Sequence, residues 1–95
     1  MKILRVRFEE GFIVVETDEE CTISLPLSYF PRLNEATPEE RENYRIFGDG
    51  QYVNFPDLDE DLYLPALLTG KRSRESEKSL NKWREWREKR KRSRS

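Results

Sequence analysis

The sequence contains no histidine and a single cysteine, Cys21. Without histidine, the chain cannot form Ser–His–Asp triads, the usual zinc sites or the commonest general base, so catalysis would depend on Asp, Glu, Lys, Tyr or Cys. One cysteine cannot form a disulfide within the chain, which is typical of a reducing compartment. Cys21 has no basic neighbour in the sequence, so we interpret it as a small buried side chain. We predict a non-enzymatic protein that uses no cofactor and no metal.

Long hydrophobic runs are also missing. The first residues, MKILRVRF, alternate apolar and charged side chains, whereas a signal peptide or a membrane span needs a continuous apolar stretch. The sequence therefore predicts a cytoplasmic protein that does not interact with membranes.

Charge is abundant but unevenly distributed. Residues 1–70 hold six Lys/Arg and fifteen Asp/Glu, a net charge of −9, while residues 71–95 hold twelve Lys/Arg and four Asp/Glu, a net charge of +8. This asymmetry predicts an acidic α+β domain at 1–70 and a basic, tryptophan-containing helical tail at 71–95. A domain this small buries only about 60% of the surface of its unfolded chain. We therefore expect a docked protein partner or a homodimer to support it.

The first third of the chain has the patterns of strands. Residues 3–8 alternate apolar and charged side chains, residues 12–17 form a β-branched run, and residues 21–27 alternate again. A Gly-containing turn separates the first two segments. Together they predict an antiparallel meander of three strands, with Pro26 at a strand end or an edge.

The middle of the chain predicts a helix and a second hairpin. Thr37 can cap a helix, Pro38 suits its first position, and Glu40 completes a capping box, so we expect a short helix over residues 38–44. The GDG turn inside residues 46–55 favours a hairpin. The expected fold is α+β: a small antiparallel sheet with one short packed helix, followed by an amphipathic basic helix.

The basic tail has helical spacing over about residues 75–92. At 100° per residue, Leu80, Trp83 and Trp86 fall within an arc of about 120°, and Arg87 and Arg90 continue the same side. Glutamates near its start and basic residues near its end complement the helix dipole. The sequence therefore predicts a helix with an aromatic stripe that becomes basic towards its end.

Three interpretations of this helix remain open. It could be a solvated extension whose tryptophans cover the domain or lie in a homodimer. It could instead bind a groove of a partner protein, with the contacts made by Leu80, Trp83, Trp86, Arg87 and Arg90. It could also contact nucleic acid, through Arg84, Arg87, Arg90, Lys91, Arg92 and Arg94. A membrane-surface helix is disfavoured because three apolar residues bury little area.

An acidic run, residues 57–61, is the second candidate site. Its carboxylates belong to Asp57, Asp59, Glu60 and Asp61. They could bind a hard cation, but the run lacks the central Gly and the length of an EF-hand loop. We interpret it first as a solvated turn that leads into a short strand or helix, and otherwise as an acidic surface for a partner.

The segments LPLSYFPRL and ATPEERENYRIFGDGQYVNFPDLDEDLYLPALLTG closely resemble the bacterial domain-of-unknown-function family numbered twenty-four forty-two. The matching elements run in order over about residues 3–70: Pro31, Leu33, Ala36, Asn43, Gly50, Phe55, the run 58–61, Leu67, Leu68 and Gly70. The resemblance implies a small α+β fold and a gene that is often adjacent to one for another small protein, as in toxin–antitoxin pairs. It implies no catalytic residues, and the basic tail lies outside it.

These observations favour a non-enzymatic interaction module, the antitoxin-like or accessory member of a two-gene pair. The expected mechanism is binding of a partner protein, the adjacent-gene product or a second copy, through the C-terminal helix. The alternative is a nucleic-acid-binding regulator that uses the basic tail and whose affinity falls steeply with salt.

Overall fold

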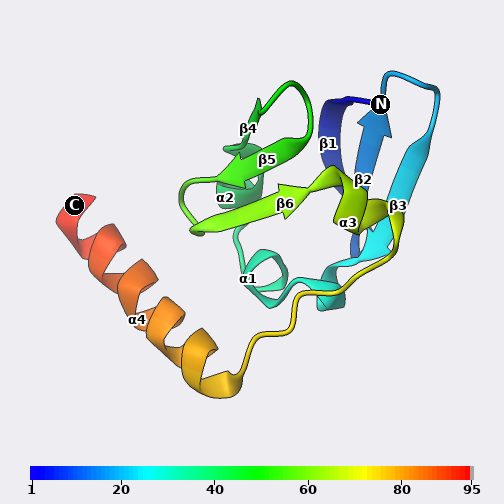
Figure 1. The fold of residues 1–95 in the computed structure, drawn as a ribbon. Helices are drawn as coiled ribbons and strands as arrows, with labels where there is room; N and C mark the ends of the chain where they lie inside the picture. Colours follow the sequence, from blue (N-terminus) through cyan, green and yellow to red (C-terminus); the bar gives the residue numbers. More distant parts are fainter. Residues whose placement is uncertain (95) are drawn as a thin grey trace.

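Six short strands form two three-stranded antiparallel sheets in the computed structural model, which describes residues 1–94 and side chains up to Ser93 (Figure 1). Sheet A contains β1 (Ile3–Glu9), β2 (Phe12–Thr17) and β3 (Thr22–Pro26), and sheet B contains β4 (Arg45–Phe47), β5 (Tyr52–Phe55) and β6 (Glu60–Tyr63). The helical elements are η1 (Leu27–Tyr29), α1 (Pro31–Asn34), α2 (Pro38–Glu42), α3 (Leu64–Leu68) and α4 (Glu77–Arg94). The α+β class is confirmed.

Sheet A is the predicted meander. Val15 of β2 pairs with Val6 of β1 and with Ile23 of β3. Side chains alternate between the two faces of a strand, so these three residues share the face that packs on the core. β3 ends at Pro26, because proline cannot donate to a further ladder hydrogen bond.

Sheet B extends the predicted hairpin by one strand. The β4–β5 turn contains Asp49 and Gly50 at φ angles of 56° and 81°, a conformation that suits the Asp-Gly step. The acidic run then leads into β6, which pairs with β5. The two sheets are linked where Ile3 N donates to Gly50 O at 2.8 Å. A side chain at position 50 would place its Cβ 2.6 Å from Lys2 Cβ, so this junction requires glycine.

The short helices follow local signals. The capping box of α2 is present, with Glu40 N donating to Thr37 Oγ1 at 3.2 Å and Thr37 N donating to Glu40 Oε1 at 2.8 Å. α2 ends at Glu42, two residues before the predicted end. The sequence predicted one helix in residues 1–70, whereas the structure also has α1 and α3, which each carry a proline in their first turn. At four and five residues, they are too short to show a helical period.

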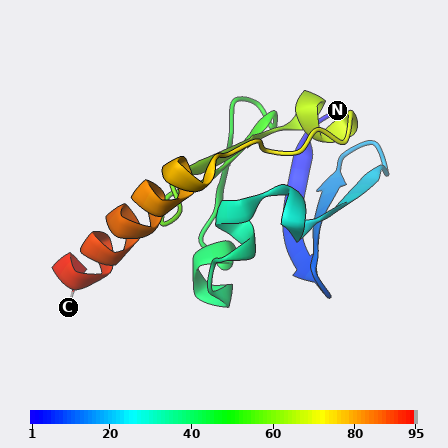
Figure 2. The same cartoon turned by 90° about the horizontal axis from the view of Figure 1, so that it is seen from below.

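The hydrophobic core lies between the sheets and α1, and α4 contributes to it. Its fully buried side chains are Phe55, Ile13, Leu33, Leu58, Leu64, Val15 and Val53. Leu80 and Trp83 of α4 belong to the same buried cluster. Figures 1 and 2 show α4 along the side of the molecule that is remote from sheet A. We call residues 1–70 the body.

Candidate functional site

The candidate site is the interface between α4 and the body, and it begins with the cap of α4. Ser79 N donates to Ser76 Oγ at 3.1 Å, and Leu80 N donates to Ser76 O at 2.9 Å. Ser76 therefore acts as the N-cap, which explains why α4 begins at Glu77 rather than at the predicted residue 75.

Trp83 is the central anchor of α4. Its side chain is 4% exposed, and its indole Nε1–H donates to the backbone oxygen of Leu58 at 2.6 Å. The guanidinium carbons of Arg32 and Arg87 lie 5.8 and 5.5 Å from the centre of its ring, within the range of cation–π attraction. The apolar surface of the indole is thus buried within the chain, and its one hydrogen-bond donor is paired there as well.

Arg87 makes the best-enclosed ion pair of the interface. Its Nε donates to Glu40 Oε2 at 2.9 Å, and its Nη2 donates to Glu40 Oε1. The side chains of Arg87 and Glu40 are only 14% and 11% exposed. The hydrogen bonds from Arg87 lower the pKa of Glu40 to about 2. Glu40 therefore serves α4 and the capping box of α2 at once.

Three further arginine contacts surround this pair. Arg84 donates to both carboxylate oxygens of Glu35, at 2.8 and 2.7 Å, and thereby lowers the pKa of Glu35. Arg32 of the body donates to Glu75, just before α4, at 2.6 to 3.2 Å, and thereby lowers the pKa of Glu75. Arg90 donates to the backbone oxygen of Pro56 at 2.8 Å.

The acidic run presents its four carboxylates in different directions. Asp57 lies 3.7 Å from Arg90 and accepts a hydrogen bond from Asn43 at 2.9 Å. Asp59 is exposed, 3.7 Å from Arg32. Asp61 accepts from Asn54 on the outer face of sheet B at 2.6 Å. The basic element that faces this run is therefore the chain's own α4 together with Arg32.

Glu60, the remaining acidic residue of the run, has a raised pKa. Its burial raises its pKa to about 7, and Arg32 opposes the rise only in part. Among residues 1–94, no cluster of His, Cys, Asp and Glu side chains is arranged to hold a metal ion.

The predicted partner-binding stripe of α4 lies on the body. Leu80 and Trp83 are buried, and Trp86 is half-buried beneath Arg90, whose guanidinium carbon lies 4.9 Å from its ring centre. The residues predicted for nucleic-acid contact divide into two groups. Arg84, Arg87 and Arg90 lie against carboxylates of the body, whereas Lys91 and Arg92 are exposed and the side chain of Arg94 lies outside the described residues.

Sequence reasoning did not identify the body's half of this interface. Glu35 and Arg32 stand in no motif that points to α4, and Glu40 was assigned only to the capping box. The one available signal was the opposite charge of the two parts of the chain, which indicates attraction but not a location.

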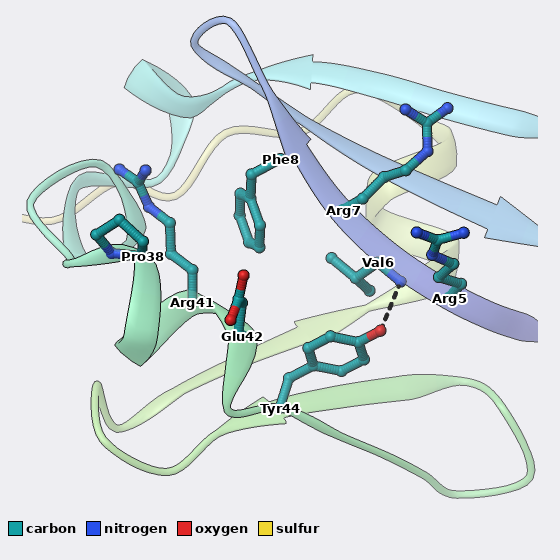
Figure 3. A pocket seen from close by; sticks show the side chains of 8 residues that line it. All are labelled: Arg5, Val6, Arg7, Phe8, Pro38, Arg41, Glu42 and Tyr44. Carbon is teal, nitrogen blue, oxygen red and sulfur yellow. Dashed lines mark hydrogen bonds between the residues drawn. The ribbon is translucent and has the colours of Figure 1, made fainter.

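A separate cavity of about 490 Å³ lies between β1 and α2 (Figure 3). Val6 N donates to the Tyr44 hydroxyl at its floor, at 3.1 Å. Arg41 donates to the backbone oxygens of Leu33 and Asn34. Figure 3 shows Arg5 and Arg7 pointing away from Arg41, so the three guanidinium groups lining this cavity do not converge on one ligand position.

Within residues 1–94, no helix is both long and apolar enough to cross a membrane.

The comparison with family models agrees with the resemblance found in the sequence. The model described as "Protein of unknown function (DUF2442)" matches residues 3–73. The chain belongs to this family. α4, which begins at Glu77, lies outside the match.

Two solved structures share the fold of this DUF2442 chain. A protein of unknown function from Rhodospirillum rubrum has a TM-score of 0.66 at 24% identity, over 78% of this chain and 92% of the other. An uncharacterized protein from Chromobacterium violaceum has a TM-score of 0.65 at 27% identity, over 77% of this chain and 69% of the other. No curated protein matches the sequence.

Proposed function

We propose that this protein is a non-enzymatic interaction module, the antitoxin-like or accessory member of a two-gene pair, which exchanges α4 between its own body and a partner protein. The observation that carries the proposal is the construction of the α4 interface. A tryptophan anchor and matched arginine–carboxylate pairs are the features of a helix bound in a groove of another protein. Here both halves of such a complex occur in one chain.

The body sets the energy that a partner must match. Burial of a large apolar side chain such as Leu80 contributes about 1.5–3 kcal/mol, and Trp83 adds its hydrogen bond to Leu58. Arg87 and Glu40 are both largely buried, and leaving either charge unpaired is costly. A partner that captures α4 therefore needs an apolar groove with carboxylates on its rim.

The position of α4 also disfavours the nucleic-acid alternative. Arg84 and Arg87 are already held by carboxylates, and the body around them has a net charge of −9. A phosphate backbone would have to displace these pairs while approaching an acidic surface. Binding of a protein with an acidic groove requires only the replacement of one set of carboxylates by another.

Glu40→Gln in the full chain tests the exchange. The amide keeps the capping box, which accepts Glu or Gln at this position, but leaves Arg87 without its counter-charge. The fraction of molecules with α4 released rises, and the apparent affinity for a helix-capturing partner rises with it. We expect capture of the purified adjacent-gene product to increase about tenfold or more.

Matched variants separate exchange from other effects. Glu39→Gln makes the same chemical change at an exposed position of α2 and should leave capture unchanged. Trp86→Ala, which removes part of the captured face, should weaken capture. Equal capture by all four proteins would reject the proposal, and retention of DNA or RNA that disappears with salt would support the nucleic-acid alternative instead.

A further inference from the structure

The outer face of sheet B carries three aromatic rings, one from each strand. Phe47 pairs with Tyr52, and Tyr52 pairs with Tyr63, so the rings lie in one row across the sheet. Their centres are 5.1 and 4.8 Å apart and their planes differ by 19° and 24°. The side chains are 37%, 37% and 45% exposed. We call these three residues the aromatic ladder.

The β4–β5 turn is shaped to hold the ladder. A Cβ at Gly48 would lie 2.7 Å from the Tyr52 ring, so only glycine lets that ring stand beside Phe47. The guanidinium carbon of Arg45 lies 5.8 Å from the centre of the Phe47 ring. Because the rings cover one another's faces, a nucleobase or a sugar ring finds little free ring face, and the exposed surface consists mainly of ring edges and hydroxyl groups.

A second row of side chains lies beside the ladder on the same face. Arg45 of β4, Asn54 of β5 and Asp61 of β6 are register partners, and Asn54 Nδ2 donates to Asp61 Oδ1 at 2.6 Å. This polar row has a positive end, a neutral centre and a negative end. Its net charge is zero on a body whose net charge is −9.

We infer that this face is the contact surface of a homodimer. Rotation by 180° about an axis that lies in the contact plane parallel to β5 reverses the order of the strands. It therefore places Arg45 opposite Asp61 of the second copy, twice, and Tyr52 opposite Tyr52. A two-fold contact of this kind must be self-complementary, and this pattern of charges and rings meets that requirement. The whole chain has a net charge of −1, so α4 docked on the body offsets most of the repulsion between two acidic bodies.

Sedimentation velocity of the full chain over a wide concentration range tests the inference. We expect a reversible monomer–dimer equilibrium. Asp61→Arg and Arg45→Asp should each weaken it at least tenfold, because like charges then face each other across the axis. The double variant R45D/D61R should restore the dimer. Tyr52→Ala should weaken it, and Phe12→Ala, at an exposed position of sheet A, should not.

The double variant R45D/D61R is the decisive test. Arg45 and Asp61 lie on the two outer strands of sheet B with β5 between them, so restoration reports a contact between copies. The indole N–H resonance of Trp83 verifies that each variant is folded. A monomer at every concentration, a dimer unaffected by the single variants, or a double variant that remains monomeric would each overturn the inference. The Arg45 and Asp61 variants leave the α4 contacts described above in place, and the Glu40 variants test α4 exchange separately.

Discussion

Trp83 on α4 and Tyr52 on sheet B are both aromatic residues that contact other rings or guanidinium groups, but they differ in how much of their surface the chain covers. Trp83 is 4% exposed, and its single donor is bonded to Leu58. Tyr52 is 37% exposed, and it stacks on its two neighbours in the aromatic ladder. The first cluster is completed within the chain, whereas the second leaves a surface for another molecule. The difference shows that aromatic composition alone does not identify a binding surface.

Removal of the Trp83 side chain should have the largest effect on stability and therefore tests this difference most strongly. Trp83→Ala should destabilise the protein by about 3–5 kcal/mol, because it leaves a cavity in the core. Trp83→Phe keeps most of the ring but loses the hydrogen bond to Leu58 and should cost about 1–2 kcal/mol. Urea unfolding measures both. A cost below about 1 kcal/mol for the alanine variant would mean that the residue is not part of the core in solution.

Loss of Arg87 should have the next largest effect. Arg87→Met preserves the apolar stem and leaves the Glu40 carboxylate partly buried without its partner, at a cost of about 3 kcal/mol. In the double variant E40Q/R87M no charge remains, so it should be more stable than R87M alone. Thermal and urea unfolding of the wild type, E40Q, R87M and E40Q/R87M would show this, and additive losses would argue against a coupled pair.

Glu60 gives the stability of the protein a pH dependence. Its pKa in the folded protein is about 7, above the ordinary value of 4.5, so its protonated form favours folding. This contribution is complete below pH 4.5 and is lost as the pH rises towards 7. Glu60→Gln should therefore be more stable than the wild type above pH 7, by about 2 kcal/mol. Unfolding curves on the two sides of this window test it, and equal differences at both would disprove it.

Glu40 gives the stability of the protein a pH dependence of the opposite sign. Its pKa of about 2 in the folded protein lies below 4.5, so its contribution is complete above pH 4.5 and is lost as the pH falls towards 2. Glu40→Gln should flatten the acid side of the stability profile. An unchanged acid limb in this variant would contradict the assignment.

The smallest effects are expected where side chains meet solvent. Arg84→Ala breaks an ion pair whose members are each about one-third exposed, and should cost less than about 1 kcal/mol. Tyr52→Ala should likewise change the stability of the monomer little compared with Trp83→Ala, while it acts on the dimer. If Tyr52→Ala destabilised the monomer as much as Trp83→Ala, the contrast between the two clusters would be wrong.

Much of the fold could be predicted because its signals are local. The alternation in residues 3–8, the Asp-Gly step of the second hairpin and the capping box at Thr37 each specify a structure within a few residues. The acidic run led into a strand, one of the two outcomes expected. The sequence predicted the second hairpin but not that it forms a separate sheet with β6, because pairing between distant strands is set by tertiary folding. The short helices α1 and α3 were not anticipated, because segments of four and five residues carry almost no periodicity.

Only the α4 side of the candidate site could be predicted from the sequence. The stripe of Leu80, Trp83 and Trp86 indicates that one face of α4 is buried, but not against which surface. Its partners, Glu35 and Glu40 among them, are brought together by tertiary folding. The short connection between α3 and α4 gives the helix a high effective concentration at the body, which favours docking within the chain over binding to a second molecule.

Hydrogen exchange of the two indole N–H groups, followed by NMR in the free protein, tests the docking of α4 most directly. Trp83 donates to Leu58 in the core, whereas Trp86 is only half-buried on the same helix and serves as the internal control. With α4 docked, we expect the indole proton of Trp83 to exchange only through unfolding of the whole protein, far more slowly than that of Trp86. Equally fast exchange of both protons would show that α4 is not held on the body.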